Sequence, residues 1–164
     1  MEGIRIPGID PGSRFCGYGV VERGLGGRIG YVECGVIEPT RTAPLHLRLA
    51  EICDGLTEVV DELRPTHVAV EGVFHGVNAR SALQLGHSRG VALMVAGARE
   101  LDVFEYAPAT VKRQVAGNGA ASKEQVSAMV RHLCELKKPP RLDATDALAV
   151  AICHAFRIRR QAHP

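Results

Sequence analysis

Four acidic residues that border apolar segments constrain this chain more than any other feature of its sequence. Asp10 ends the segment IRIPGID, Glu71 ends HVAVE, and Asp143 and Asp146 lie in DATDALAVA. A carboxylate beside apolar side chains is costly unless positive charge neutralises it. The pattern therefore predicts a fold in which the four carboxylates face cations, and a pair of divalent metal ions is the natural candidate.

The length and composition favour a single domain over residues 1–164. With 164 residues and 46% hydrophobic content, the chain can bury a core without disulfides. Its five cysteines are scattered and have no zinc-site spacing, which is typical of a reducing compartment. Neither a signal peptide nor a membrane-spanning segment is recognisable, so we expect a cytoplasmic protein without a membrane partner.

The net charge of +2 is small, but the basic residues are unevenly placed. Lys112, Arg113 and Lys123 flank a glycine-containing segment, and Lys137 and Lys138 precede the second acidic pair. If metal ions neutralise the carboxylates, these basic groups dominate the local field. Such a field favours a polyanionic ligand.

The hydrophobic pattern predicts a mixed sheet with helices on both faces. Pro7 lacks the amide that a central strand would use, which weakens the start of the first strand. The segment 108–119 is interpreted as a basic connection without regular structure. The expected elements are three antiparallel strands near 4–10, 17–21 and 29–37, a helix over 45–63, a strand over 67–71, a helix over 78–100, a strand over 103–106, and helices over about 123–133 and 143–156.

A stripe of small residues marks the helix expected over 78–100. Ala82, Gly86 and Gly90 recur one turn apart, and a helical glycine costs about 1 kcal/mol relative to alanine. The stripe indicates a close backbone approach. Tight contact with the sheet and a subunit interface explain it equally well.

The acidic residues fall where an α/β sheet gathers its ligands. Asp10 and Glu71 end strands, so they lie side by side if these strands are neighbours. Asp143 and Asp146 are three residues apart at a helix start and project from about one face. Taken singly, an aspartate can cap a helix or form a turn, and a glutamate at a strand end can be solvated. The pair in the helix is harder to explain by capping alone.

Four oxygen ligands without a cysteine or histidine cluster favour Mg²⁺ or Mn²⁺ over zinc. Two such ions can activate a water on one side of a phosphorus atom and stabilise the leaving oxygen on the other. The predicted chemistry is phosphodiester hydrolysis.

Several ordered motifs resemble the bacterial RuvC family of Holliday-junction resolvases. They are GIDPGS followed by GYG, then EGVF with NARSALQLG, then FEY and DATDALA, and together they span nearly the whole chain. The resemblance implies an α/β, ribonuclease H-like fold with a mixed five-stranded sheet. It also implies a metal-dependent crossover junction endodeoxyribonuclease that acts in recombination and repair. Such a homodimer makes paired symmetric nicks in a four-way junction and leaves 5'-phosphate and 3'-hydroxyl ends; a branch-migration motor is its expected partner.

The resemblance also assigns roles to individual positions. The family's metal-binding acidic residues match Asp10, Glu71, Asp143 and Asp146, and two Mg²⁺ ions per site are expected, with Mn²⁺ as a substitute. Family residues near the scissile strand match Lys112 and Lys123, and a loop aromatic that contacts bases matches Phe74. Arg80 and Arg89 are further candidates for DNA backbone contacts. A Phe74 side chain folded back on the core is the alternative for that position.

Two positions depart from the family pattern. Pro7 replaces an aliphatic strand residue, and Cys16 stands where a small hydroxyl residue is common, which raises the questions of strand geometry and redox sensitivity. Two other functions compete with the nuclease. One is a non-catalytic junction-binding protein of the same fold, although four buried carboxylates would repel DNA. The other is an actin-like or sugar-kinase-like ATPase, which normally needs a second domain and a second phosphate loop.

Overall fold

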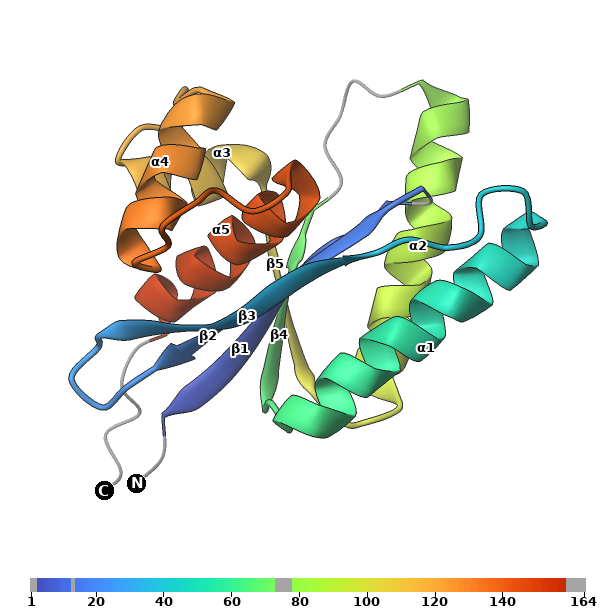
Figure 1. Ribbon diagram of the computed structural model, residues 1–164, viewed down its shortest axis with the longest axis horizontal. Coiled ribbons are helices and arrows are strands. Elements are labelled where there is room, and N and C mark those ends of the chain that lie inside the picture. Colours follow the sequence, from blue (N-terminus) through green and yellow to red (C-terminus); the bar gives the residue numbers. More distant parts are fainter. Residues whose placement is uncertain (1–2, 13, 73–77, 159–164) are drawn as a thin grey trace.

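The computed structural model describes residues 3–12, 14–72 and 78–158. Within these residues the expected strands and long helices are all present, and their order is confirmed (Figure 1). The elements are β1 (Ile4–Asp10), β2 (Cys16–Arg23), β3 (Ile29–Ile37), α1 (Leu45–Leu63), β4 (His67–Glu71), α2 (Ala79–Gly97), β5 (Asp102–Tyr106), α3 (Pro108–Ala116), α4 (Lys123–Leu133) and α5 (Leu142–Arg157).

The strands form one mixed sheet in the order β3-β2-β1-β4-β5. The first three strands pair antiparallel, while β1 pairs parallel with β4, and β4 parallel with β5. The prediction of a five-stranded mixed sheet is therefore confirmed. Because β1 and β4 are parallel neighbours, their carboxyl ends lie at the same edge.

Helices cover both faces of the sheet, as Figure 1 shows, with α1 and α2 on one face and α3, α4 and α5 on the other. Successive residues of β4 point to opposite faces of the sheet, and so to the two helical layers in turn. Val68 and Val70 pack in the cluster with α1 and α2, whereas Ala69 packs with α5. By the same alternation, Glu71 lies on the α5 face.

Pro7 is accommodated inside β1. It pairs with Val20 of β2, and the parallel ladder between β1 and β4 is formed by Gly8 and Ile9, directly after the proline. Pro7 has no backbone N–H group to donate, but it lies just before the part of the strand that pairs with β4. The strand runs unbroken to Asp10.

The interpretation of 108–119 as an irregular connection was wrong, because residues Pro108–Ala116 form the helix α3. Pro108 occupies the first turn, where its missing amide costs nothing. Gly117 ends the helix with φ 79°, the left-handed conformation that glycine adopts readily. The helix is only 9 residues long, so its hydrophobic pattern is too short to stand out from the flanking glycines.

The helix α5 lies directly on β1 and β2 because glycines leave room for it. A Cβ atom added at Gly8 would collide with the carbonyl oxygen of Ala147, and one added at Gly17 would collide with that of Asp143. Side chains at these two positions would push the helix away from the sheet. The close approach brings the first turns of α5 next to the end of β1.

The small-residue stripe on α2 makes no close contact within the described part of the chain. Gly86 and Gly90 are exposed, and an added Cβ at either would meet nothing within 4 Å. Tight contact with the sheet is therefore wrong as an explanation of these glycines. Leu83 and Met94 on the same helix are 62% and 56% exposed. The subunit interface remains a prediction.

A chain of polar side chains ties α5 to β4 and β5. The ring nitrogen Nδ1 of His154 lies 2.6 Å from the Tyr106 hydroxyl, and its Nε2 lies 3.0 Å from Nδ1 of His67. Phe104 stacks on both imidazoles. Burial, and then the neighbouring His67, lower the pKa of His154 to about 4, so its imidazole is neutral near pH 7. This satisfied polar network fixes the second half of α5 against the sheet.

All five cysteines are free thiols, and three of them are buried: Cys16, Cys134 and Cys153. Burial and the nearby Asp10 raise the pKa of Cys16 to about 12. A thiol that is neither exposed nor ionised is a poor nucleophile, which argues against redox sensitivity at Cys16. No helix in the described ranges has both the length and the apolar character needed to cross a membrane.

Candidate active site

Asp10 and Glu71 lie side by side at one edge of the sheet, as predicted. Asp10 is the last residue of β1 and Glu71 the last residue of β4, and the ladder just before them pairs Ile9 with Val70. Strand alternation directs both carboxylates to the face that α5 covers. The sequence prediction that these two residues converge is confirmed.

The second acidic pair reaches the same place from α5. Asp143 lies in the first turn of this helix and Asp146 in the second. Since the start of α5 rests on Gly17, the residue paired with Asp10, both aspartates begin close to the end of β1. Carboxylates from β1, β4 and α5 therefore face a common space.

Burial and mutual repulsion disfavour the charged forms of three of these carboxyl groups and raise their pKa values. Burial, and then the charges of Glu71, Asp146 and Asp143, raise the pKa of Asp10 to about 8. Burial and then Asp146 raise the pKa of Glu71, and burial and Asp143 raise that of Asp146. Burial is the largest cause in each case and neighbouring negative charge adds to it, so both oppose ionisation of three of the four carboxyl groups.

Two lysines, Lys112 and Lys123, partly offset the negative charge of the site. Lys123 lowers the pKa of Asp10, Glu71 and Asp146, and Lys112 lowers those of Glu71 and Asp146. The Nζ atom of Lys123 lies 3.8 Å from Oδ2 of Asp146. Both lysines line a cavity of about 180 Å³ together with Glu71 and Asp146. Four predicted site residues therefore share one cavity.

Lys123 and Lys112 are positioned by two different helices. Lys123 is the first residue of α4, whose start is held by a capping box: the Ser122 hydroxyl accepts from the Gln125 amide, and the Gln125 side chain accepts from the Ser122 amide. Lys112 lies in the middle of α3, the helix that the sequence pattern did not predict. The cavity between β4, α3, α4 and α5 depends on both helices.

The donor set fits a hard divalent cation by its chemistry. All four groups are carboxylates, and their mutual repulsion would be relieved by bound positive charge. Within residues 3–12, 14–72 and 78–158, however, no three histidine, cysteine, aspartate or glutamate side chains are already arranged as ligands of one ion. Bound cations would offset the mutual repulsion that contributes to the raised pKa values of Asp10, Glu71 and Asp146.

The other predicted DNA contacts have different surroundings. Phe74 lies outside the described residues. Arg80 is exposed in the first turn of α2. Arg89 is only 14% exposed, and its Nη2 lies 2.5 Å from Oε1 of Glu105 on β5. The guanidinium of Arg89 thus ties α2 to the sheet, while its predicted contact with DNA stays untested.

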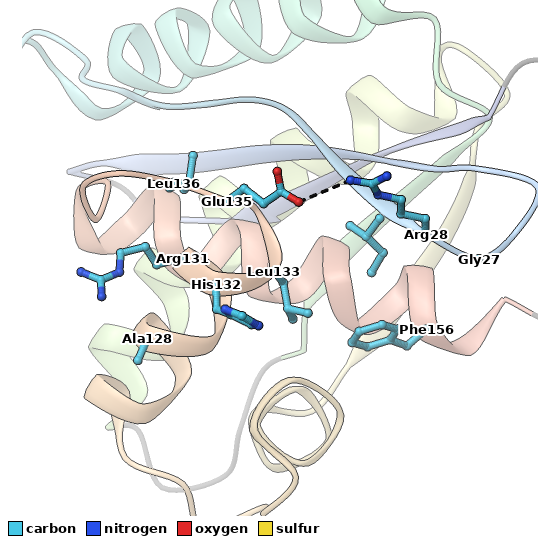
Figure 2. A pocket seen from close by; sticks show the side chains of 10 residues that line it. Gly27, Arg28, Ala128, Arg131, His132, Leu133, Glu135, Leu136 and Phe156 are labelled. Atoms are coloured by element: carbon cyan, nitrogen blue, oxygen red, sulfur yellow. Dashed lines mark hydrogen bonds and ion pairs between the residues drawn. The ribbon is translucent and has the colours of Figure 1, made fainter.

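A separate cavity lies away from the carboxylates (Figure 2). Its volume is about 660 Å³, and its walls come from the turn between β2 and β3, from α4 with the segment after it, and from the end of α5. Leu133 and Phe156 face its interior, and Arg28 and Glu135 form an ion pair of 3.4 Å at its rim. None of the predicted site residues lines this cavity.

The fold and the acidic cluster define the class of this protein. A mixed five-stranded sheet of this order, with carboxylates at the ends of two central parallel strands and on a covering helix, is the arrangement of ribonuclease H-like α/β proteins. Two solved structures of Thermus thermophilus RuvC share this fold. One has a TM-score of 0.85 at 36% identity and covers 93% of this chain and 94% of its own. The other, in complex with a Holliday junction substrate, has a TM-score of 0.87 at 35% identity and covers 93% of each chain.

Sequence comparison identifies the family. The family model for crossover junction endodeoxyribonuclease RuvC matches residues 6–154. The RuvC protein of Myxococcus xanthus is 52% identical over 153 residues, covering 92% of this chain and 80% of its own. That of Syntrophotalea carbinolica is 50% identical over 152 residues, covering 93% and 94%. The chain belongs to the RuvC family of crossover junction endodeoxyribonucleases, and the predicted resemblance is confirmed.

Proposed function

We propose that residues 1–164 form a single nuclease domain that resolves four-way DNA junctions. It makes paired symmetric nicks that leave 5'-phosphate and 3'-hydroxyl ends, in recombination and repair in the cytoplasm. The observation that carries the proposal is the convergence of four carboxylates with two lysines at one sheet edge. The similarity to a RuvC structure described in complex with a Holliday junction supports the choice of substrate.

The carboxylates are the proposed metal ligands. Asp10, Glu71, Asp143 and Asp146 would hold two Mg²⁺ ions, or Mn²⁺ in their place, and these ions would activate the attacking water and stabilise the leaving oxygen. The other three carboxylates all contribute to the raised pKa of Asp10, so Asp10 interacts electrostatically with each of them. By the family resemblance, Asp10 would be a ligand of both ions.

The two lysines would position the scissile phosphate. Lys112 and Lys123 line the cavity that Glu71 and Asp146 also line, so an ammonium can reach a phosphate oxygen held there. Lys123 now lies near Asp146, and bound metal would free its charge for the substrate. Phe74 and Arg80 are proposed as further DNA contacts, and Arg89 as one that must first leave Glu105.

A test of this function compares two substrates. The purified protein is incubated with a labelled synthetic four-way junction and with a linear duplex of the same sequence, each with Mg²⁺ and with a chelator. We expect paired nicks on the junction alone, and only with Mg²⁺. A mobility shift without cutting would point to a non-catalytic binding protein, and ATP turnover would point to a kinase-like ATPase; either would reject the proposal.

A homodimer is the proposed assembly, because two coordinated nicks need two active sites. The exposed α2 stripe is the surface that favours it: Gly86 and Gly90 leave open space, and Leu83 and Met94 present apolar side chains beside them. Small residues of this kind let two helices approach closely. A branch-migration motor as a further partner follows from the family resemblance alone.

Replacing Gly86 with glutamine is expected to give monomers that bind the junction more weakly. A Cβ atom at position 86 would meet no described atom within 4 Å outside the backbone of its own helix. Glutamine should also raise helix stability by roughly 0.5–1 kcal/mol relative to glycine, so the subunit itself should stay folded. Light scattering after size-exclusion chromatography measures the assembly. Gly26→Gln, in the open turn between β2 and β3, is the matched control. A Gly86→Gln protein that remains a dimer would exclude this surface.

A further inference from the structure

An arginine-rich cavity lies next to the candidate active site on the side opposite Lys112 and Lys123. Its volume is about 400 Å³, and it opens where the loop after β1 meets the turn from β3 to α1. None of the residues that line it was singled out by the sequence patterns. They are Arg14, Phe15, Glu38, Pro39, Arg41 and Arg48.

The sheet order places this cavity relative to the carboxylates. Ile37 at the end of β3 pairs with Cys16, and the next residue of β2, Gly17, pairs with Asp10. The ends of β3 and β1 therefore lie at the same edge, with β2 between them. The cavity flanks Asp10 toward β3, whereas the two lysines flank it beyond β4.

The charges around the cavity leave an excess of positive groups. Arg141, the residue before α5, forms an ion pair with Glu38 and places its guanidinium 4.9 Å from the centre of the Phe15 ring. Glu38 is thereby neutralised. In the part of the chain that the structure describes, Arg14, Arg41 and Arg48 form no ion pair; Glu51, on α1, accepts a 2.6 Å hydrogen bond from the Thr40 amide.

One polar atom in the wall lacks a partner. The Nε atom of Arg48 is buried and forms no hydrogen bond to any described residue. An unsatisfied buried donor on a charged group is destabilising, and an anionic acceptor bound in the cavity would satisfy it. The first turn of α1, which carries Arg48, contains no acidic residue to compete with such a ligand. One guanidinium group can bind two phosphate oxygens at once, so a cavity lined by arginines suits a phosphate ligand.

We infer that this cavity binds a phosphodiester of the DNA backbone at a point separate from the scissile phosphate. The inference rests on the proposed function, since it takes the junction as the ligand. A backbone held by arginines beyond β1 and by lysines beyond β4 would cross the carboxylates in a fixed direction. The second contact would therefore orient the strand that is cut.

The test measures how junction binding depends on salt. Each phosphate contact contributes about 0.9 to the slope of log affinity against log salt concentration. The double variant Arg14→Gln with Arg41→Gln removes two exposed arginines, so its fold should persist, and a thermal melt checks this. In a chelator, we expect about tenfold weaker binding or more at physiological salt, and a slope shallower by about 1 for each cavity that holds a phosphodiester, hence by about 2 for a homodimer.

Arg64→Gln is the control, because it removes one exposed arginine at the other end of α1 and so gives the effect of a charge lost away from the cavity. If the wild type neither binds nor cuts the junction, the proposed function itself fails. If the wild type binds and cuts but the double variant keeps the slope of the Arg64→Gln control, only the cavity assignment is overturned. Stabilisation by inorganic phosphate relative to chloride at equal ionic strength, with an unchanged junction slope, would also overturn the assignment to DNA.

Discussion

Replacing Asp146 with asparagine is expected to lower the rate of junction cutting by about 10³-fold or more, while junction binding is kept or strengthened. The side chain keeps its shape but loses the charge that would hold metal beside Glu71 and Lys123. A loss of about 10³-fold corresponds to roughly 4 kcal/mol of transition-state stabilisation, within the range of a single electrostatic group in a preorganised site. Binding should not suffer because one negative charge that repels DNA is removed.

Two measurements separate the effects on binding and cutting. The single-turnover rate with saturating protein and Mg²⁺ reports cutting, and fluorescence anisotropy in a chelator reports binding. Asp54→Asn, an exposed residue of α1 that forms no ion pair in the described structure, is the matched control and should match the wild type in both. An Asp146→Asn protein that cuts normally but no longer binds would remove this residue from the active site.

Replacing Asp10 with asparagine is expected to stabilise the metal-free protein at neutral pH. The pKa of Asp10 rises from 3.8 to about 8, so the folded chain holds a proton there that the unfolded chain has lost. Between about pH 4 and pH 8, the folded state binds more protons, so its stability falls as the pH rises. Asparagine cannot ionise and avoids this loss, which is on the order of 5 kcal/mol near the upper end of the window.

Thermal unfolding in a chelator tests whether the substitution stabilises the protein and how this effect depends on pH. Near pH 7 we expect the Asp10→Asn protein to melt about 5 °C or more above the wild type, and the difference should shrink toward pH 4. Adding Mg²⁺ or Mn²⁺ should stabilise the wild type more than the variant, because bound metal offsets the same repulsion. An Asp10→Asn protein that melts below the wild type in the chelator would contradict the buried repulsion.

The elements of this fold were largely readable from local patterns, with one exception. The strand predicted over 67–71 is β4, and the helix predicted over 45–63 is α1. The helix α3 was missed because its 9 residues give too few turns for a pattern and its flanking glycines favour a loop. That error matters for the site, since Lys112 lies on α3 and could not be placed relative to Glu71 without it.

The sequence by itself determined which groups could carry the chemistry: carboxylates at two strand ends and a pair within one helical turn. Those positions follow from local spacing, which the chain order records directly. Only the tertiary structure decided how the groups affect one another. The approach of α5 over Gly8 and Gly17, the distance from Lys123 to Asp146, and the meeting of Arg14, Arg41 and Arg48 in one cavity all join residues distant in the chain. Charge interactions and burial depend on separation in space, and that separation exists only once the layers have packed.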